Sequence, residues 1–121
     1  MSRKVGGKYR DQYYDEFFDY LRKRTDEERG KVGKEPYSDL TIKTYVTDTF
    51  YLEKHDDRDF GDWLKNDKSM DEAYKCLVKN LYTRKNPEKD AIYYLNCMKM
   101  FDDFLKNNQK YLHKVVPVLL E

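Results

Sequence analysis

The sequence contains few of the residues that build metal sites or cross-link a fold. Only two cysteines, Cys76 and Cys97, occur in 121 residues, and each lies inside a helical pattern. This placement favours reduced, buried thiols over a disulfide framework, as in a reducing compartment. His55 and His113 are equally scattered, and no CxxC or HxxxH pair is present, which excludes the common zinc motifs. We expect no metal and no cofactor.

Long apolar runs and catalytic motifs are missing as well. No stretch is apolar for long enough to cross a membrane, and the basic segment at Met1 lacks the hydrophobic run of a signal peptide. We therefore expect a soluble, cytoplasmic protein. The Gly6-Gly7 and Gly30/Gly33 pairs lack the flanking strand and lysine of a phosphate-binding loop. No nucleophile is accompanied by a motif base, so we expect no catalytic residues and no enzymatic activity.

Aromatic residues, in contrast, are abundant. They make up 16% of the chain, with twelve tyrosines and six phenylalanines, although 39% of residues are charged and the mean hydropathy is −1.07. Disordered chains are poor in aromatic residues, and tyrosine buries a large ring that hydropathy scales undervalue. We therefore expect a folded domain with a core rich in tyrosine and phenylalanine.

The N-terminal part of the chain predicts an aromatic helix. Tyr9, Tyr13, Phe17 and Leu21 follow one another at four-residue spacing, which predicts a helix over about residues 8–25. Residues 30–36 combine two glycines with a proline, and this composition predicts a connector. The chain thus divides into an aromatic helix and linker (1–36) and a helical bundle (37–121), together one compact domain. More aromatic residues lie on this helix than one core contact needs, so Tyr9, Tyr13 and Phe17 are candidates for a protein partner or for self-association.

Capping signals predict where the remaining helices begin. Ser38 begins an amphipathic helix that ends near His55, and a short helix with Phe60, Trp63 and Leu64 ends at residues 66–68. Ser69 to Glu72 has the form of a capping box, and Asn86-Pro87 begins a helix that ends near Asn107. The tail 111–121, apolar around Pro117, is compatible with a last helix, a docked strand or the stub of a longer protein. We predict an all-α fold, a compact bundle of four to five helices.

Charge is distributed unevenly along the chain. Residues 52–72 hold eight acids against four bases, a net charge of −4, whereas residues 73–89 hold five bases against one acid, a net charge of +4. The acids Asp56, Asp57, Asp59 and Asp62 do not follow a calcium-loop pattern and predict a solvated turn. A basic helix end beside the amides of the next helix suits the phosphate backbone of a nucleic acid. The candidate DNA-binding residues are Lys75, Lys79, Tyr82, Thr83, Arg84, Lys85 and Lys89. The alternative is a lysine-rich solvated surface.

Two motifs resemble a known family. The segment from Ser38 through Thr41 and Ile42 to Tyr45, and the later run from Tyr93 to Leu105, resemble the SAM-like core-binding domain that precedes the catalytic domain of tyrosine recombinases and phage integrases. The resemblance covers residues 38–107. It implies a four-helix, SAM-like module that grips duplex DNA from one side, mainly through phosphates, during DNA recombination. The family's catalytic arginine, histidine and tyrosine have no counterpart here.

Three functions remain compatible with the sequence. The first is the non-catalytic DNA-binding module of a tyrosine recombinase or integrase. The second is the N-terminal module of a restriction or other DNA-processing enzyme. The third is a helical protein-interaction or regulatory domain that uses the aromatic helix. Steep salt dependence of DNA binding distinguishes the first two from the third.

Overall fold

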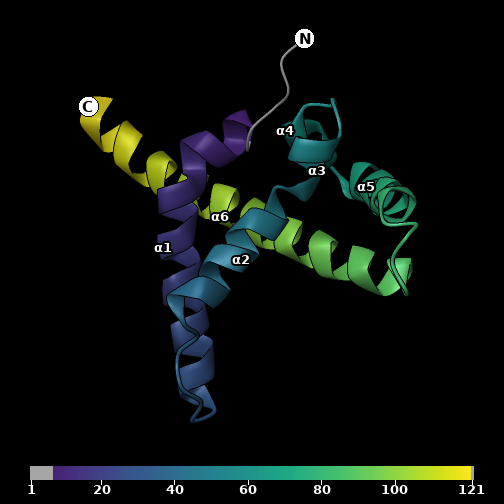
Figure 1. Cartoon of the computed structure of the whole chain (residues 1–121). Coiled ribbons are helices and arrows are strands. Elements are labelled where there is room, and N and C mark those ends of the chain that lie inside the picture. Colours follow the sequence, from purple (N-terminus) through teal and green to yellow (C-terminus); the bar gives the residue numbers. More distant parts are fainter. Residues whose placement is uncertain (1–6, 121) are drawn as a thin grey trace.

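The chain folds into α-helices packed around one aromatic core. The computed structural model describes the backbone of residues 7–120 and the side chains of residues 7–107, and within that part it contains helices and no strands. The helices are α1 (Lys8–Lys31), α2 (Asp39–Thr49), α3 (Tyr51–His55), α4 (Phe60–Trp63), α5 (Asp67–Asn80) and α6 (Pro87–Leu120). In Figure 1, α6 runs across the molecule, α1 and α2 cross its central part, and α5 lies beside its N-terminal half. The predicted all-α class is confirmed.

Helix α1 is longer than its aromatic pattern predicts, because charged pairs continue it. Arg22 and Asp26 form an i,i+4 ion pair at 3.2 Å, and Arg24 pairs with Glu28 at 3.5 Å. The helix then ends in a Schellman motif. The amide of Lys34 donates to the carbonyl of Arg29 at 2.9 Å, and the residue between them that takes a positive φ of 72° is Gly33. The predicted connector therefore begins after Val32.

The helix predicted from Ser38 to His55 is interrupted at Phe50, which separates α2 from α3. Its start is confirmed, because the Ser38 side chain accepts the amide of Thr41 at 3.2 Å. The interruption follows Thr49, whose hydroxyl donates to the Tyr45 carbonyl at 2.8 Å, a contact that often bends helices. Phe50 and Leu52 are both fully buried, so the change of direction brings both side chains into the core.

The predicted capping box at Ser69 is wrong in register. Helix α5 begins earlier, at Asp67, with Asn66 as its N-cap. The Asn66 side chain accepts the amide of Ser69 at 2.8 Å, and the Ser69 hydroxyl accepts the amide of Asn66 at 3.0 Å. Ser69 therefore occupies the third helical position of the box instead of its first. Its hydroxyl is also 2.9 Å from the carbonyl of Trp63, which ties α5 to the end of α4.

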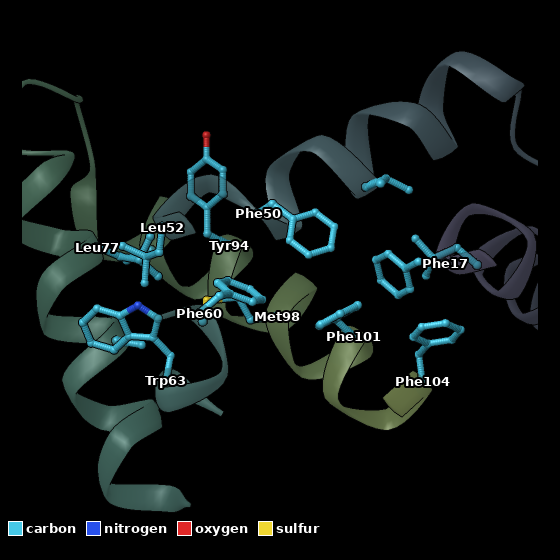
Figure 2. Close-up of a cluster of buried hydrophobic side chains, with 14 of the residues drawn as sticks. Phe17, Phe50, Leu52, Phe60, Trp63, Leu77, Tyr94, Met98, Phe101 and Phe104 are labelled. Carbon is cyan, nitrogen blue, oxygen red and sulfur yellow. The ribbon is translucent and has the colours of Figure 1, made fainter. Parts of the chain in front are cut away.

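Phenylalanine rings form the centre of the core (Figure 2). The ring of Phe101 on α6 lies 5.2 Å from that of Phe17 and 5.0 Å from that of Phe50, both edge-to-face. Phe104 packs against Phe17 at 5.5 Å. Pairs of this kind stabilise a fold by about 0.5–1.5 kcal/mol each beyond their buried area. Because Phe17 comes from α1, the N-terminal helix shares a core with the rest of the chain.

Helix α6 continues beyond the predicted end at Asn107. Its backbone remains helical to Leu120, so the tail extends α6 instead of forming a separate strand. The side chains of this extension, including His113, lie outside the described residues. Among the helices of the described part, none has a stretch both long and apolar enough to lie across a bilayer.

Candidate nucleic-acid interface

The turn between α5 and α6 carries the residues predicted to bind DNA. Leu81, the C-cap of α5, is only 2% exposed, and its amide donates to the carbonyl of Leu77 at 2.9 Å. The amide of Arg84 returns to the carbonyl of Leu81 at 2.8 Å. At the other side of the turn, the Asn86 side chain accepts the amide of Lys89 at 3.2 Å, as its predicted capping role requires. The turn is thus held at both ends.

All seven predicted side chains are exposed on the last turns of α5, the connecting turn and the first turn of α6. The five charged side chains among them are not equally available for a contact with phosphate. Lys75 pairs with Asp71 one helical turn earlier, at 3.3 Å. Lys79, Lys85 and Lys89 form no ion pair with any side chain in the described part of the chain. These three ammonium groups are therefore the cations of this region that no described carboxylate pairs with.

Arg84 is directed toward the protein. Its guanidinium contacts the Asp90 carboxylate at 3.2 Å and donates to the Tyr94 hydroxyl at 3.3 Å. The hydrogen bond to Tyr94, with the contribution of Asp90, raises the pKa of Arg84 above its ordinary value. Arg84 consequently links the turn to α6, and Asp90 balances its charge at the partly exposed surface of the turn.

Behind Arg84 lies a row of aromatic rings that the sequence analysis did not connect to the turn. Figure 2 shows Tyr94 at the margin of the core with its hydroxyl directed away from the phenylalanine cluster. Its ring stacks on Tyr51 of α3 at 4.6 Å, and Tyr51 in turn lies 4.3 Å from His55. Burial raises the pKa of Tyr51 and lowers that of His55. Asp90 and Tyr94 are four residues apart in a helix, so their side chains lie on the same face. This spacing is the sequence signal that both can contact Arg84.

The N-terminus of α6 is less open to an anion than the sequence suggested. The Asn86 side chain already accepts a hydrogen bond from the amide of Lys89, and two acids, Glu88 and Asp90, lie in the first turn. These groups satisfy the helix dipole from within the chain. Phosphate contacts at this turn therefore depend on the lysine side chains more than on backbone amides.

Several carboxylates of the acidic segment 52–72 are held in ion pairs, two of them with cations of the same segment. Asp59 pairs with Lys8 at 3.3 Å, Asp62 with Lys65 at 2.9 Å, and Glu72 with Arg58 at 3.1 Å. Within the side chains that the structure describes, no group of three or more histidine, cysteine or acidic residues is placed to hold a metal ion.

The residues predicted to form a partner face on α1 are mostly turned inward. Phe17 is completely buried, so the prediction that it is exposed to a partner is wrong. Tyr13 is half-buried, with its ring 5.6 Å from Phe101. Tyr9 is half-buried too, and its hydroxyl donates to Asp59 at 2.9 Å. The aromatic side chains of α1 therefore pack in the core, or, in the case of Tyr9, contact Phe60 at the start of α4.

A groove of about 650 Å³ lies between the end of α4, α5 and α6. Leu64, Met70, Tyr74 and Leu95 contribute apolar surface to it, and charged side chains of both signs line the rest. Two of its lysines are engaged in ion pairs, Lys106 with Asp102 and Lys65 with Asp62. The groove therefore lacks the uniform positive charge that a nucleic-acid backbone requires.

Comparison of the chain with protein-family models, with curated proteins and with solved structures finds no match.

Proposed function

We propose that this chain is a non-catalytic DNA-binding module that holds duplex DNA through its phosphates at the α5–α6 turn. The observation that carries the proposal is the set of three exposed lysines, Lys79, Lys85 and Lys89, which have no acidic partner among the described side chains. Lysine side chains on a fixed turn are suited to phosphate contacts, which dominate the affinity of proteins for DNA.

The charge layout supports the same assignment. The acidic segment 52–72, with its net charge of −4, would repel the phosphates of DNA. Two cations from outside this segment, Lys8 and Lys75, pair with its Asp59 and Asp71 and so balance part of that charge. The lysines of the turn have no such partners, so the positive potential remains concentrated there.

The proposed context is the SAM-like core-binding type of tyrosine recombinases. In that arrangement the helices position the DNA and a separate domain performs the recombination chemistry. The helical order from Ser38 to Leu105 and the all-α fold are compatible with this type. An N-terminal module of another DNA-processing enzyme would place the same surface against the same ligand.

Salt dependence tests the proposal. Binding to a short duplex is measured at several salt concentrations for the wild type and for a variant in which Lys79, Lys85 and Lys89 are replaced by Gln. We expect binding that weakens steeply with salt, and a logarithmic slope reduced by about one for each lysine that contacts a phosphate. Arg84 and Lys75 are left intact because both are engaged in ion pairs.

A matched control carries the same change of charge elsewhere. Lys23, Lys31 and Lys43 are exposed on α1 and α2 and form no ion pair with the side chains of residues 7–107. Replacing these three by Gln is expected to change the slope much less. Absence of binding at low salt would refute the proposal, as would equal losses in the two triple variants.

A further inference from the structure

Tyr82 differs from the other tyrosines of the described part. Its side chain is 78% exposed, the highest value among the exposed large hydrophobic residues. Every other tyrosine between residues 7 and 107 packs against the core or has a hydrogen-bond or aromatic partner. Even Tyr93, 36% exposed, donates to Asp48 at 2.6 Å. Tyr82 has no such contact among the described side chains, so most of its ring surface is free to meet a ligand.

The ring is nevertheless presented from a fixed backbone. Leu81, its neighbour, is buried, and Arg84 two residues later is held by Asp90 and Tyr94. The amide of Arg84 closes the turn onto the carbonyl of Leu81 around Tyr82. A tyrosine side chain has few rotatable bonds, and little backbone order remains to be gained on binding. Stacking of a ligand on the exposed ring would therefore cost little conformational entropy.

The surroundings of the ring define the ligand. Lys79 lies three residues before Tyr82 and Lys85 three residues after it, and neither has an acidic partner among the described side chains. An exposed aromatic ring that has an unpaired lysine three residues to either side along the chain suits a molecule that alternates flat rings with phosphates, which is a nucleic acid with accessible bases. In an intact duplex the faces of the bases are covered by their neighbours. Only an unpaired nucleotide, in a single strand, a bulge or a frayed end, offers a free face.

We propose that Tyr82 stacks on an unpaired base while the lysines of the turn hold the adjoining phosphates. This inference rests on the proposed function and specifies its substrate class, because it predicts DNA with an unpaired nucleotide as the preferred ligand. The ring would act through its π-face, which every base can match, so the contact selects for unpaired structure and not for a sequence.

The test compares three probes, an oligothymidine single strand, a fully paired duplex and the same duplex with one unpaired nucleotide. Each is titrated with the wild type, Tyr82→Ala and Tyr82→Phe. We expect Tyr82→Ala to weaken binding of the single strand and the bulged duplex about tenfold, the effect of losing one base stack. Binding of the paired duplex is expected to change less than about twofold. Tyr82→Phe is expected to bind like the wild type, because stacking needs the ring and not the hydroxyl.

Salt dependence separates this contact from the lysines. Tyr82→Ala is expected to leave the salt slope unchanged, whereas replacing Lys79, Lys85 and Lys89 lowers it. The inference is overturned if Tyr82→Ala weakens all three probes equally, or if Tyr82→Phe loses as much affinity as Tyr82→Ala, since the hydroxyl would then bind the backbone. If the wild type binds none of the probes and binds polyglutamate instead, the ligand is an acidic polypeptide and the proposed function fails as well.

Discussion

The backbone of Gly7 lies directly against the carboxylate of Glu53. A Cβ added to Gly7 would collide with Oε1 and with the carboxylate carbon of Glu53. The carboxylate accepts the amides of Tyr9 and Arg10, at 2.9 Å and 3.1 Å, and so caps α1 from a distant point of the chain. Glu53 is only 2% exposed, and the positive end of the α1 dipole favours its negative charge. The start of the longest helix outside α6 is therefore fixed by α3.

Replacing Gly7 by Ala is expected to destabilise the protein. The φ of Gly7 is 87°, which costs a residue with a Cβ about 1–3 kcal/mol, and the contact with Glu53 adds to this. Urea unfolding measures the change. Gly30→Ala is the control, because Gly30 lies within α1 with nothing near its Cβ position, and alanine there is expected to raise stability by up to about 1 kcal/mol. Equal effects of the two substitutions would contradict the close approach of Gly7 and Glu53.

Ser69→Ala is expected to be more costly than Ser38→Ala. The Ser69 hydroxyl is buried, accepts the amide of Asn66 and lies against the Trp63 carbonyl, so its removal leaves buried groups unpaired, at about 1–3 kcal/mol. Ser38 is an exposed N-cap, for which about 1 kcal/mol is typical. Thermal and urea unfolding of both variants measure the difference. If Ser69 were itself an N-cap, the two losses would be similar.

The charge of Asp59 is expected to stabilise the fold at neutral pH. The hydrogen bond from the Tyr9 hydroxyl, followed by Lys8, lowers the pKa of Asp59 below its ordinary value. A carboxylate whose pKa is lower in the folded state contributes stability above its unfolded pKa of about 4, and this contribution is lost as the pH falls through the folded pKa. Asp59→Asn should therefore reduce the free energy of unfolding at neutral pH and have little effect at about pH 2.5.

Asp15 provides the control for this pH dependence. It is exposed on α1 and forms no ion pair with the described side chains, so Asp15→Asn is expected to leave the pH profile of stability nearly unchanged. Urea unfolding at both pH values measures all three proteins. A larger effect of Asp59→Asn in acid than at neutral pH would mean that the Tyr9–Asp59 contact does not operate as described.

The two thiols are expected to differ in reactivity. Cys97 is 1% exposed, and burial raises its pKa to about 12, so almost no thiolate forms near neutral pH. Cys76 is only partly buried, although burial and the nearby Asp56 raise its pKa too. A disulfide-exchange reagent at mildly alkaline pH is expected to modify Cys76 slowly and Cys97 only after unfolding. In Cys76→Ala, modification in the native state as fast as in urea would show that Cys97 is accessible.

Local chemistry made some elements predictable from sequence and left others undecided. The starts of α2 and α6 follow from Ser38 and Asn86, whose side chains cap the nearest amides without help from elsewhere. The start of α5 could not be predicted in the same way, because Asn66 and Ser69 are three positions apart and either residue type can cap a helix. The choice between them depends on the Trp63 carbonyl that Ser69 meets at the end of α4.

The site shows a similar division. The exposure of Lys79, Lys85 and Lys89 follows from their place at the ends of polar helical faces. The inward direction of Arg84 depends on Asp90 and Tyr94, which approach it only after the turn has brought α6 back beside α5. On α1, the periodic pattern marked Phe17 as aromatic and helical, but its burial depends on Phe101 and Phe104 from the other end of the chain.

Trp63 gives the protein an internal optical probe. It is the sole tryptophan of the chain, 4% exposed, with a guanidinium from Arg58 at 4.3 Å from its ring. No hydrogen-bond partner for its Nε1 occurs in the described part of the chain. Such an indole emits at short wavelength when buried and shifts to the red when water reaches it. Its emission therefore reports whether the α4–α5 packing is intact, so the integrity of each variant can be followed in the cuvette used for a DNA titration, without a dye.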